Sequence, residues 1–164
     1  TMKFIIQAWA VLSVTVLIGC SETGISGQSG GVGSGAQGSI DDPASEAYFE
    51  ASVGDRVFFG IDQSVLSAEA RSVLDGQATW LNSNGDYTVI IEGHADEQGT
   101  REYNLALGAR RANALREYLI GAGVGGDRIR TLSYGKERPV EICSLERCYA
   151  QNRRGVTVLN NNGF

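Results

Sequence analysis

Residues 87–121 read YTVIIEGHADEQGTREYNLALGARRANALREYLIG, and three local patterns follow one another in this run. The apolar segment 87–92 is rich in β-branched residues and predicts a strand inside a sheet. Residues 93–100 are mostly polar and contain two glycines, which is typical of a loop. From 101 to 121, apolar residues return every three or four positions, so a long helix is expected there.

The expected helix has an apolar face and a polar rim. Asn104, Arg111 and Tyr118 lie seven positions apart and form one row along this rim, while Arg110 points to solvent. The row faces the preceding loop, so Arg111 is expected to meet Asp96 although fifteen positions separate them. The apolar face comprises Leu105, Gly108, Ala109, Ala112, Leu115 and Leu119.

Shorter elements flank this run on both sides. They are a strand at 56–59, a polar loop at 60–64, a helix capped by Ser67, a strand at 130–133, a short helix at 145–152 and a strand at 156–159. The capped helix carries Ala70, Val73, Leu74, Ala78 and Leu81 on one face. This order predicts an α/β (α+β) fold, a two-layer sandwich with both main helices on one face of the sheet.

The composition restricts the classes of function. The 164 residues, 42% of them hydrophobic, suffice for one globular domain and a tail. A net charge of −5 argues against a nucleic-acid partner, because such binding needs a broad basic surface. Residues 51–164 contain twelve arginines and one lysine, which favours a small carboxylate ligand; surface ion pairs are the alternative explanation.

The N-terminus has the features of an export signal. Lys3 precedes an apolar run over 4–19, which is short for a membrane-spanning helix. The run ends in Leu17-Ile18-Gly19-Cys20, which resembles a bacterial lipobox. The resemblance implies a signal peptide over 1–19 and acyl chains such as palmitate on Cys20, which hold the mature chain on a membrane. A plain signal peptide or a signal anchor is the alternative.

Residues 20–50 contain seven glycines, six serines and five acidic residues, but no basic residue. A segment of this composition buries too little apolar surface to offset the entropy of ordering, so a flexible tether is expected. A Gly/Ser chain of about 30 residues spans roughly 30 Å on average. The folded domain is then expected over 51–164.

Several spaced motifs connect the chain to a known family. The main ones are Glu92-Gly93-His94-Ala95-Asp96-Glu97-Gln98-Gly99 and the run 103–113; 133–139 and Asn152-Arg153-Arg154 agree with them in order. Together they closely resemble the peptidoglycan-binding motif of the OmpA-like domain family over about residues 51–160. The resemblance implies a β-α-β-α-β-β sandwich whose helices pack on one face of a mixed four-stranded sheet.

The resemblance also implies a site for meso-diaminopimelate, whose side chain in the peptidoglycan stem peptide ends in an ammonium and a carboxylate. Matched by position, Asp96 accepts the ammonium and Arg111 holds the carboxylate. A buried ion pair that only fixes the loop is the alternative. Further peptidoglycan contacts are expected at Asn104, Asp62, Phe59, Leu107 and His94, whereas Arg153 and Arg154 form either ion pairs or ligand contacts.

The role implied by the resemblance is structural. It is that of a lipid-anchored protein on the periplasmic face of the outer membrane, which fastens this membrane to peptidoglycan. Membership of the Tol-Pal system, TolB as a partner and a role in cell division are implied as well. An adaptor that acts through protein partners without binding the wall is the alternative.

Catalysis and metal binding are not expected. A wall-cleaving enzyme would need a Cys/His pair, a zinc triad or an isolated glutamate with a raised pKa, and none stands out. His94, Asp96 and Glu97 lack the spacing of zinc ligands, and no cofactor is expected. In an oxidising periplasm Cys143 and Cys148 can form a local disulfide; two free thiols are the alternative, since spacing alone does not fix the geometry.

Overall fold

The computed structural model describes residues 38–161 and 163, and in this part of the chain four strands form one mixed sheet. The strands are β1 (Arg56–Phe58), β2 (Thr88–His94), β3 (Ile129–Gly135) and β4 (Arg154–Asn160), in the order β1-β4-β2-β3. β2 runs parallel to β3, and β4 runs antiparallel to both β1 and β2. The predicted interior position of β2 is confirmed.

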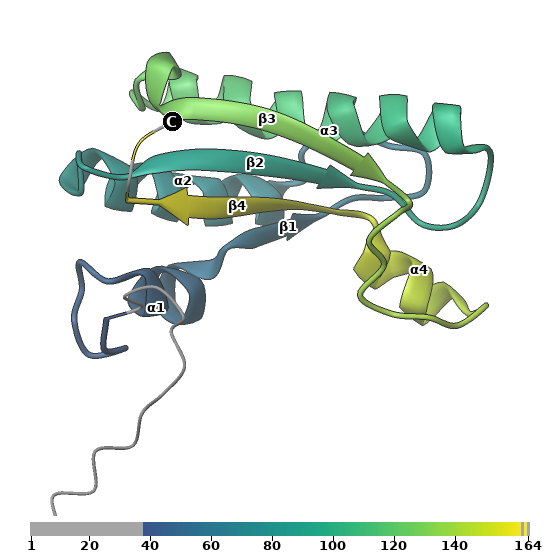
Figure 1. Cartoon of the computed structure of the whole chain (residues 1–164), viewed down its shortest axis with the longest axis horizontal. Coiled ribbons are helices and arrows are strands. Elements are labelled where there is room, and N and C mark those ends of the chain that lie inside the picture. The colour runs from purple at the N-terminus through teal and green to yellow at the C-terminus, as the bar shows by residue number, and fades with distance from the viewer. Residues whose placement is uncertain (1–37, 162, 164) are drawn as a thin grey trace, which may run out of the picture. The chain divides into compact units, whose positions relative to one another are not determined.

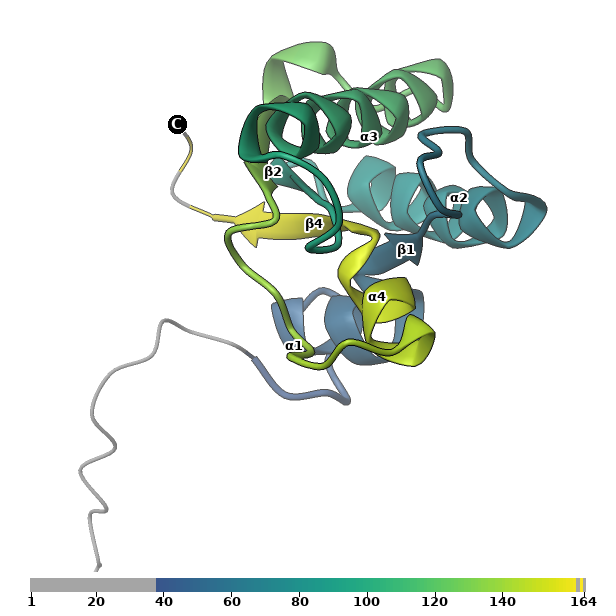
Figure 2. The same cartoon turned by 90° about the vertical axis from the view of Figure 1, so that its right-hand side faces the viewer.

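Two long helices, α2 (Ala68–Ser83) and α3 (Arg101–Gly121), cover one face of this sheet. Figure 1 shows the opposite face toward the viewer with both helices behind it, and Figure 2 shows them on the same side. The predicted two-layer sandwich is therefore confirmed. Three short elements complete the fold: α1 (Glu46–Tyr48) continued by a π-helical turn (Phe49–Gly54), a 3-10 turn (Gly126–Arg128), and α4 (Glu146–Asn152).

Local hydrogen bonds explain where the long helices begin and end. Ser67 Oγ accepts from the backbone N–H of Ala70, and Thr100 Oγ1 accepts from that of Tyr103, so each helix starts at a side-chain cap. At the other end of α2, the guanidinium of Arg128 donates to the carbonyls of Leu81, Asn84 and Tyr87. This cation satisfies carbonyls that the helix end leaves unpaired.

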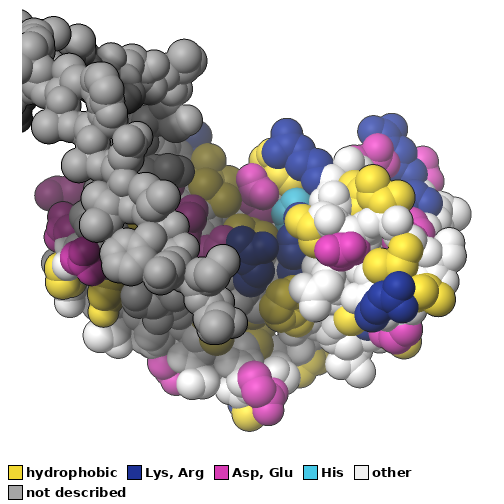
Figure 3. Space-filling model, turned by 90° about the horizontal axis from the view of Figure 1, so that it is seen from below, with side chains coloured by type: hydrophobic (Ala, Val, Ile, Leu, Met, Phe, Trp, Pro, Cys, Tyr) yellow, Lys and Arg dark blue, Asp and Glu magenta, His cyan; other side chains and the backbone are white. Residues whose placement is uncertain are grey.

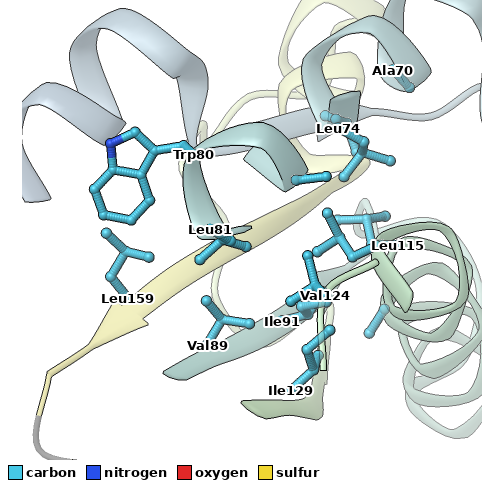
Figure 4. Packing of buried hydrophobic residues seen from close by; sticks show 14 of the residues in the cluster. Ala70, Leu74, Trp80, Leu81, Val89, Ile91, Leu115, Val124, Ile129 and Leu159 are labelled. Atoms are coloured by element: carbon cyan, nitrogen blue, oxygen red, sulfur yellow. The ribbon is translucent and has the colours of Figure 1, made fainter. Parts of the chain in front are cut away.

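The hydrophobic core lies between the helices and the sheet. Figure 4 shows side chains of α2, α3, β2 and β4 that point toward one another. Five large aliphatic side chains of the core are fully shielded from solvent: Leu74, Leu81, Ile91, Leu115 and Leu119. Burying one large aliphatic side chain contributes about 1.5–3 kcal/mol, so these residues hold the two layers together.

The backbones of α3 and β2 approach each other closely at two glycines. A Cβ atom on Gly93 would collide with the carbonyl group of Gly108, and one on Gly108 would lie 2.7 Å from the carbonyl oxygen of Gly93. Only residues without a side chain permit this distance. The contact fixes the start of α3 beside the end of β2.

The last part of the expected tether is folded, which corrects the sequence-based interpretation of residues 38–50. Phe49 is fully buried, and its ring centroid lies 4.9 Å from that of Trp80. The indole N–H of Trp80 donates to the carbonyl of Pro43 at 2.7 Å. The aromatic pair gives this segment the apolar contact that its Gly/Ser-rich composition does not suggest. The expected signal peptide and Cys20 lie outside the described residues.

The buried face of α3 also differs from the expected one. Leu105 is half exposed, whereas Leu107 is buried, and the polar residues Asn104 and Arg111 are almost completely shielded. Their polar groups are satisfied by backbone carbonyls of neighbouring segments, which allows them to lie inward. Arg110 is exposed, as expected. None of the described helices has the length and apolar character that a membrane span requires.

Candidate functional site

A cavity of about 290 Å³ lies at the end of the sheet where β2 ends and α3 begins. Three segments meet there: the loop between β1 and α2, the loop between β2 and α3, and the first turns of α3. The lining residues are Ile61, Asp62, Asp96, Gln98, Gly99, Tyr103, Asn104 and Leu107. Four of the residues expected to contact a ligand, Asp62, Asp96, Asn104 and Leu107, are therefore brought together.

Asp96 presents a carboxylate that is buried but reaches the cavity. Its Oδ1 accepts from the backbone N–H of Gln98 at 3.2 Å, and its Oδ2 accepts from Arg153 Nη1 at 3.1 Å. Each oxygen of an ionised carboxylate has two lone pairs, so each retains one for a further donor. The group is thus oriented by the protein and still able to bind a cation.

Asp62 supplies a second carboxylate from the loop between β1 and α2. Its backbone is left-handed, with φ of 54°, which is uncommon for a residue other than glycine. The hydroxyl of Tyr103 donates to Asp62 Oδ1, and this hydrogen bond raises the pKa of Tyr103. The phenol is therefore protonated at neutral pH and ties the loop after β1 to the first turn of α3.

Asn104 and Lys136 hold the loop that carries Asp96. Asn104 Nδ2 donates to the carbonyl of Gln98 at 2.7 Å, and Lys136 Nζ donates to the carbonyl of Gly99, also at 2.7 Å. Asn104 is 1% exposed, so its contribution is to brace the loop and shape the cavity wall.

Arg111 lies behind the cavity wall and does not line the cavity. The guanidinium donates to three backbone carbonyls: that of Gln63 at 2.8 Å, that of His94 at 2.8 Å and that of Gly60 at 3.1 Å. It also stacks 5.1 Å from the ring centroid of Phe59. Burial lowers its pKa to about 10, against the opposing effect of Asp96, so it is charged at neutral pH.

The expected direct contact between Asp96 and Arg111 is replaced by another pair. Among the described residues, the ion-pair partner of Asp96 is Arg153, which precedes β4. Arg111 instead serves the loop 60–63, whose carbonyls cover it. Each of its three nitrogen atoms donates to one carbonyl, so the guanidinium is oriented by the backbone of Gly60, Gln63 and His94.

Phe59 and His94 also lie outside the cavity. Phe59 is buried beneath Arg111. His94 is 1% exposed and stacks on Tyr134, with centroids 5.5 Å apart. Burial, together with Arg154 and Arg138, lowers the pKa of His94 to about 4, so it is neutral at pH 7. Figure 3 shows this histidine, in cyan, beside basic side chains.

In the described part of the chain, no group of three His, Cys, Asp or Glu residues is arranged to hold a metal ion. Cys143 and Cys148 are joined in a disulfide, with Cα atoms 5.8 Å apart. This disulfide lies at the N-terminal end of α4, at the same end of the sheet as the cavity (Figure 1).

Sequence reasoning missed several parts of the site. Tyr103, Gln98, Gly99 and Ile61 line the cavity but were not expected to do so. Arg153 was left between two roles, and its position beside Arg154 in one motif did not show which arginine faces Asp96. The signal was absent because Asp96 and Arg153 are 57 positions apart and meet only through the sheet.

The site can bind a small cationic group. Two carboxylates, Asp62 and Asp96, line the cavity, and their hydrogen bonds with Tyr103, Gln98 and Arg153 leave acceptor capacity free. An ammonium ion donates three hydrogen bonds and matches such a pair of acceptors. The buried cation Arg111 stands directly behind this wall.

Comparisons with known proteins identify the family of this chain. A model of the OmpA family matches residues 58–153, and the chain belongs to this family. The peptidoglycan-associated lipoprotein of Rhizobium meliloti (strain 1021) is 50% identical over 155 residues, which cover 94% of this chain and 87% of that protein. The protein of the same name from Pseudomonas aeruginosa is 38% identical, over 93% and 95% of the two chains. Within the OmpA family, the chain is therefore a member of the peptidoglycan-associated lipoproteins.

Solved structures of other proteins share the fold of this chain. The crystal structure of the peptidoglycan-associated lipoprotein from Burkholderia pseudomallei superposes with a TM-score of 0.67 at 36% identity, covering 73% of this chain and 100% of that one. The C-terminal domain of Helicobacter pylori MotB has a TM-score of 0.61 at 18% identity, covering 65% and 84%. At this identity the second likeness concerns the fold alone.

Proposed function

We propose that this protein is a non-enzymatic lipoprotein that binds peptidoglycan without a covalent bond and fastens the outer membrane to the cell wall. The observation that carries the proposal is the cavity with the carboxylates of Asp62 and Asp96. The relatives that match this chain over most of their length are named peptidoglycan-associated lipoproteins. The ligand is the stem peptide, recognised through the zwitterionic end of meso-diaminopimelate.

The ammonium of diaminopimelate binds to Asp96. The carboxylate of Asp96 is held on two sides by Gln98 and Arg153, so this side chain loses little entropy when the ligand binds. Asp62 also lines the cavity and adds a second anionic acceptor. Leu107 offers an apolar wall for the methylene groups of the ligand.

The carboxylate of diaminopimelate binds to Arg111. In the unliganded arrangement, Gly60 and Gln63 occupy two of its donors through their carbonyls. We expect the ligand carboxylate to replace one of them, because a charged acceptor forms a stronger hydrogen bond with guanidinium than a neutral carbonyl does. The loop 60–63 then shifts when ligand binds.

The membrane end of the molecule is Cys20, which carries the acyl chains after removal of residues 1–19. The segment from Cys20 to the folded part supplies the reach between the outer membrane and the wall. Membership of the Tol-Pal system, with TolB as a partner and a contribution to cell division, belongs to the same proposal. A Cys20→Ser chain is expected to leave the membrane fraction and still bind peptidoglycan.

Sedimentation with isolated sacculi tests the proposal. The full chain, purified in detergent, is expected to pellet with the sacculi, whereas Asp96→Asn is expected to remain in the supernatant. The control is Asp86→Asn, an exposed residue just before the other end of β2. Pelleting of Asp96→Asn at the level of the unmodified chain would contradict the assigned site.

The same experiment separates the alternatives. A protein adaptor without wall binding would stay in the supernatant even without a substitution. A wall-cleaving enzyme would release soluble fragments from the sacculi during the incubation. Intact sacculi that carry the protein into the pellet are the outcome expected for a tether.

A further inference from the structure

Arg153 connects the cavity to the disulfide-bonded segment before β4. Its side chain is 6% exposed, and all three of its nitrogen atoms donate. Nε donates to the carbonyl of Phe59 at 3.2 Å, Nη1 to Asp96 Oδ2 at 3.1 Å, and Nη2 to Glu146 Oε1. The guanidinium is therefore fixed in one orientation, with Asp96 on one side and Glu146 on the other.

The charges of Asp96, Arg153 and Glu146 together determine how strongly the site attracts a cationic ligand. Arg153 alone would neutralise Asp96 and weaken its attraction for an ammonium ion. Glu146 supplies a second carboxylate to the same guanidinium. Burial lowers the pKa of Arg153, but the hydrogen bonds that it donates to Glu146 and Asp96, together with their charges, outweigh this and raise the pKa overall. One cation between two anions leaves a net negative charge beside the cavity.

The position of Glu146 depends on the chain around it. Glu146 is the first residue of α4, a helix of 7 residues, and lies between the two cysteines of the Cys143–Cys148 disulfide. The far end of α4 is held by Asn152, whose side chain accepts from the backbone N–H of Val140 and donates to the carbonyl of Glu141. So short a helix is not stable by itself, and these links keep it in place.

We propose that the segment Cys143–Cys148 is a working part of the ligand site, in which Glu146 orients Arg153 and offsets its charge, so that Asp96 remains a fixed and net-anionic acceptor. This inference rests on the proposed binding of diaminopimelate at Asp96. Arg153 and Glu146 are positioning residues, and the disulfide holds them in register with the cavity.

The first test measures the affinity of the full chain in detergent for a diaminopimelate stem peptide by isothermal titration calorimetry. Glu146→Gln keeps the shape of the side chain and removes its charge, and we expect the affinity to fall about two- to fivefold, the range of a partly exposed charge pair. Glu117→Gln is the control, because Glu117 forms an exposed pair with Arg116 on α3.

A modified ligand separates this electrostatic role from a merely structural one. The comparison uses the same stem peptide acetylated on the side-chain amine of diaminopimelate, which removes the ammonium. If Glu146 acts through the ammonium, Glu146→Gln and the unmodified chain bind the acetylated peptide equally weakly. An equal loss for both peptides would overturn the proposal.

The disulfide is tested by a double-mutant cycle. Replacing both cysteines, Cys143→Ser with Cys148→Ser, is expected to weaken binding by a factor similar to that of Glu146→Gln. The three substitutions together should weaken it no further, because residues that act through one pathway are not additive. If the combined variant loses affinity by the product of the two separate factors, the shared pathway is contradicted. Unchanged affinity after removal of the disulfide would contradict it as well.

The proposal and the function on which it rests can fail separately. Loss of binding in Asp96→Asn together with full binding in Glu146→Gln refutes only the role of the segment Cys143–Cys148. Unchanged affinity in Asp96→Asn refutes the site itself. Thermal unfolding of every variant shows whether the fold is retained under the conditions of the titration.

Discussion

Buried polar side chains shape the site at the scale of single residues. Arg111 and Asn104 lie inside the protein because backbone carbonyls accept their hydrogen bonds. Leaving one such carbonyl unpaired in the interior costs about 1–3 kcal/mol. The two residues therefore stabilise the loops around the cavity.

Arg111→Lys is expected to destabilise the protein and to abolish stem-peptide binding. An ammonium group cannot reproduce the fork that serves Gly60, Gln63 and His94, so we expect the free energy of unfolding to fall by about 2–4 kcal/mol. Urea unfolding and calorimetry measure the two effects. A variant as stable as the unmodified chain would show that the three carbonyl contacts contribute little.

Asp96→Asn provides the comparison. It retains the shape of the side chain beside Gln98 and Arg153, so its loss of binding should come with a smaller loss of stability than that of Arg111→Lys.

His94 predicts a loss of stability in mild acid. Its pKa is about 4 in the folded protein, because burial and then Arg154 and Arg138 disfavour the charged form, while an unfolded histidine has a pKa of about 6.5. Between these values the unfolded state binds the proton, so stability is complete above about pH 6.5 and falls as the pH decreases. Between pH 7 and 5 the expected loss is about 1–2 kcal/mol.

Urea unfolding at several pH values, compared with that of His94→Gln, measures this loss. The variant has no group that titrates at this position, so its stability should change less across the interval. Equal slopes for the two proteins would show that another group causes the pH dependence.

At the scale of elements, the contact between α3 and β2 places the first turns of α3 beside the cavity. Gly93 and Gly108 let the two backbones approach, and the residues of α3 that line the cavity follow from this placement. The apolar pattern of α3 predicted its length correctly, from 101 to 121. It also placed Gly108, Ala112, Leu115 and Leu119 correctly on the buried face. It chose Leu105 where Leu107 is buried, because the two are equally apolar and only packing distinguishes them.

Gly108→Ala is expected to destabilise the protein although alanine favours helices. The new methyl group would meet Ser133 and the carbonyl of Gly93, and such overpacking costs about 1–3 kcal/mol. It should also weaken peptide binding by shifting Asn104. The control is Gly121→Ala at the end of α3. A Cβ atom added there would have no neighbouring atom within 4 Å, so the stability of this variant should be unchanged or higher. A stabilising Gly108→Ala would contradict the tight contact.

For the whole molecule, the folded region begins before residue 51. The burial of Phe49 against Trp80 anchors the segment 38–50 to the core. A chain that begins at residue 51 is therefore expected to be less stable than one that begins at 38, by about 3–5 kcal/mol, the effect of removing a buried phenylalanine. Equal midpoints of urea unfolding would contradict this role.

Local sequence patterns and the tertiary structure determined different parts of this protein. Periodicity, caps and turns are local, and they determined the helix limits at Ser67 and Thr100 and the interior strand β2. The motif around Asp96 and Arg111 identified the family in the same way, because its residues are close in the chain. Contacts between distant segments were decided by the tertiary structure alone: Asp96 with Arg153, Arg111 with the carbonyl of Gly60, Phe49 with Trp80. A buried polar group goes where its hydrogen bonds can be satisfied, and that position exists only once the sheet and its loops have come together.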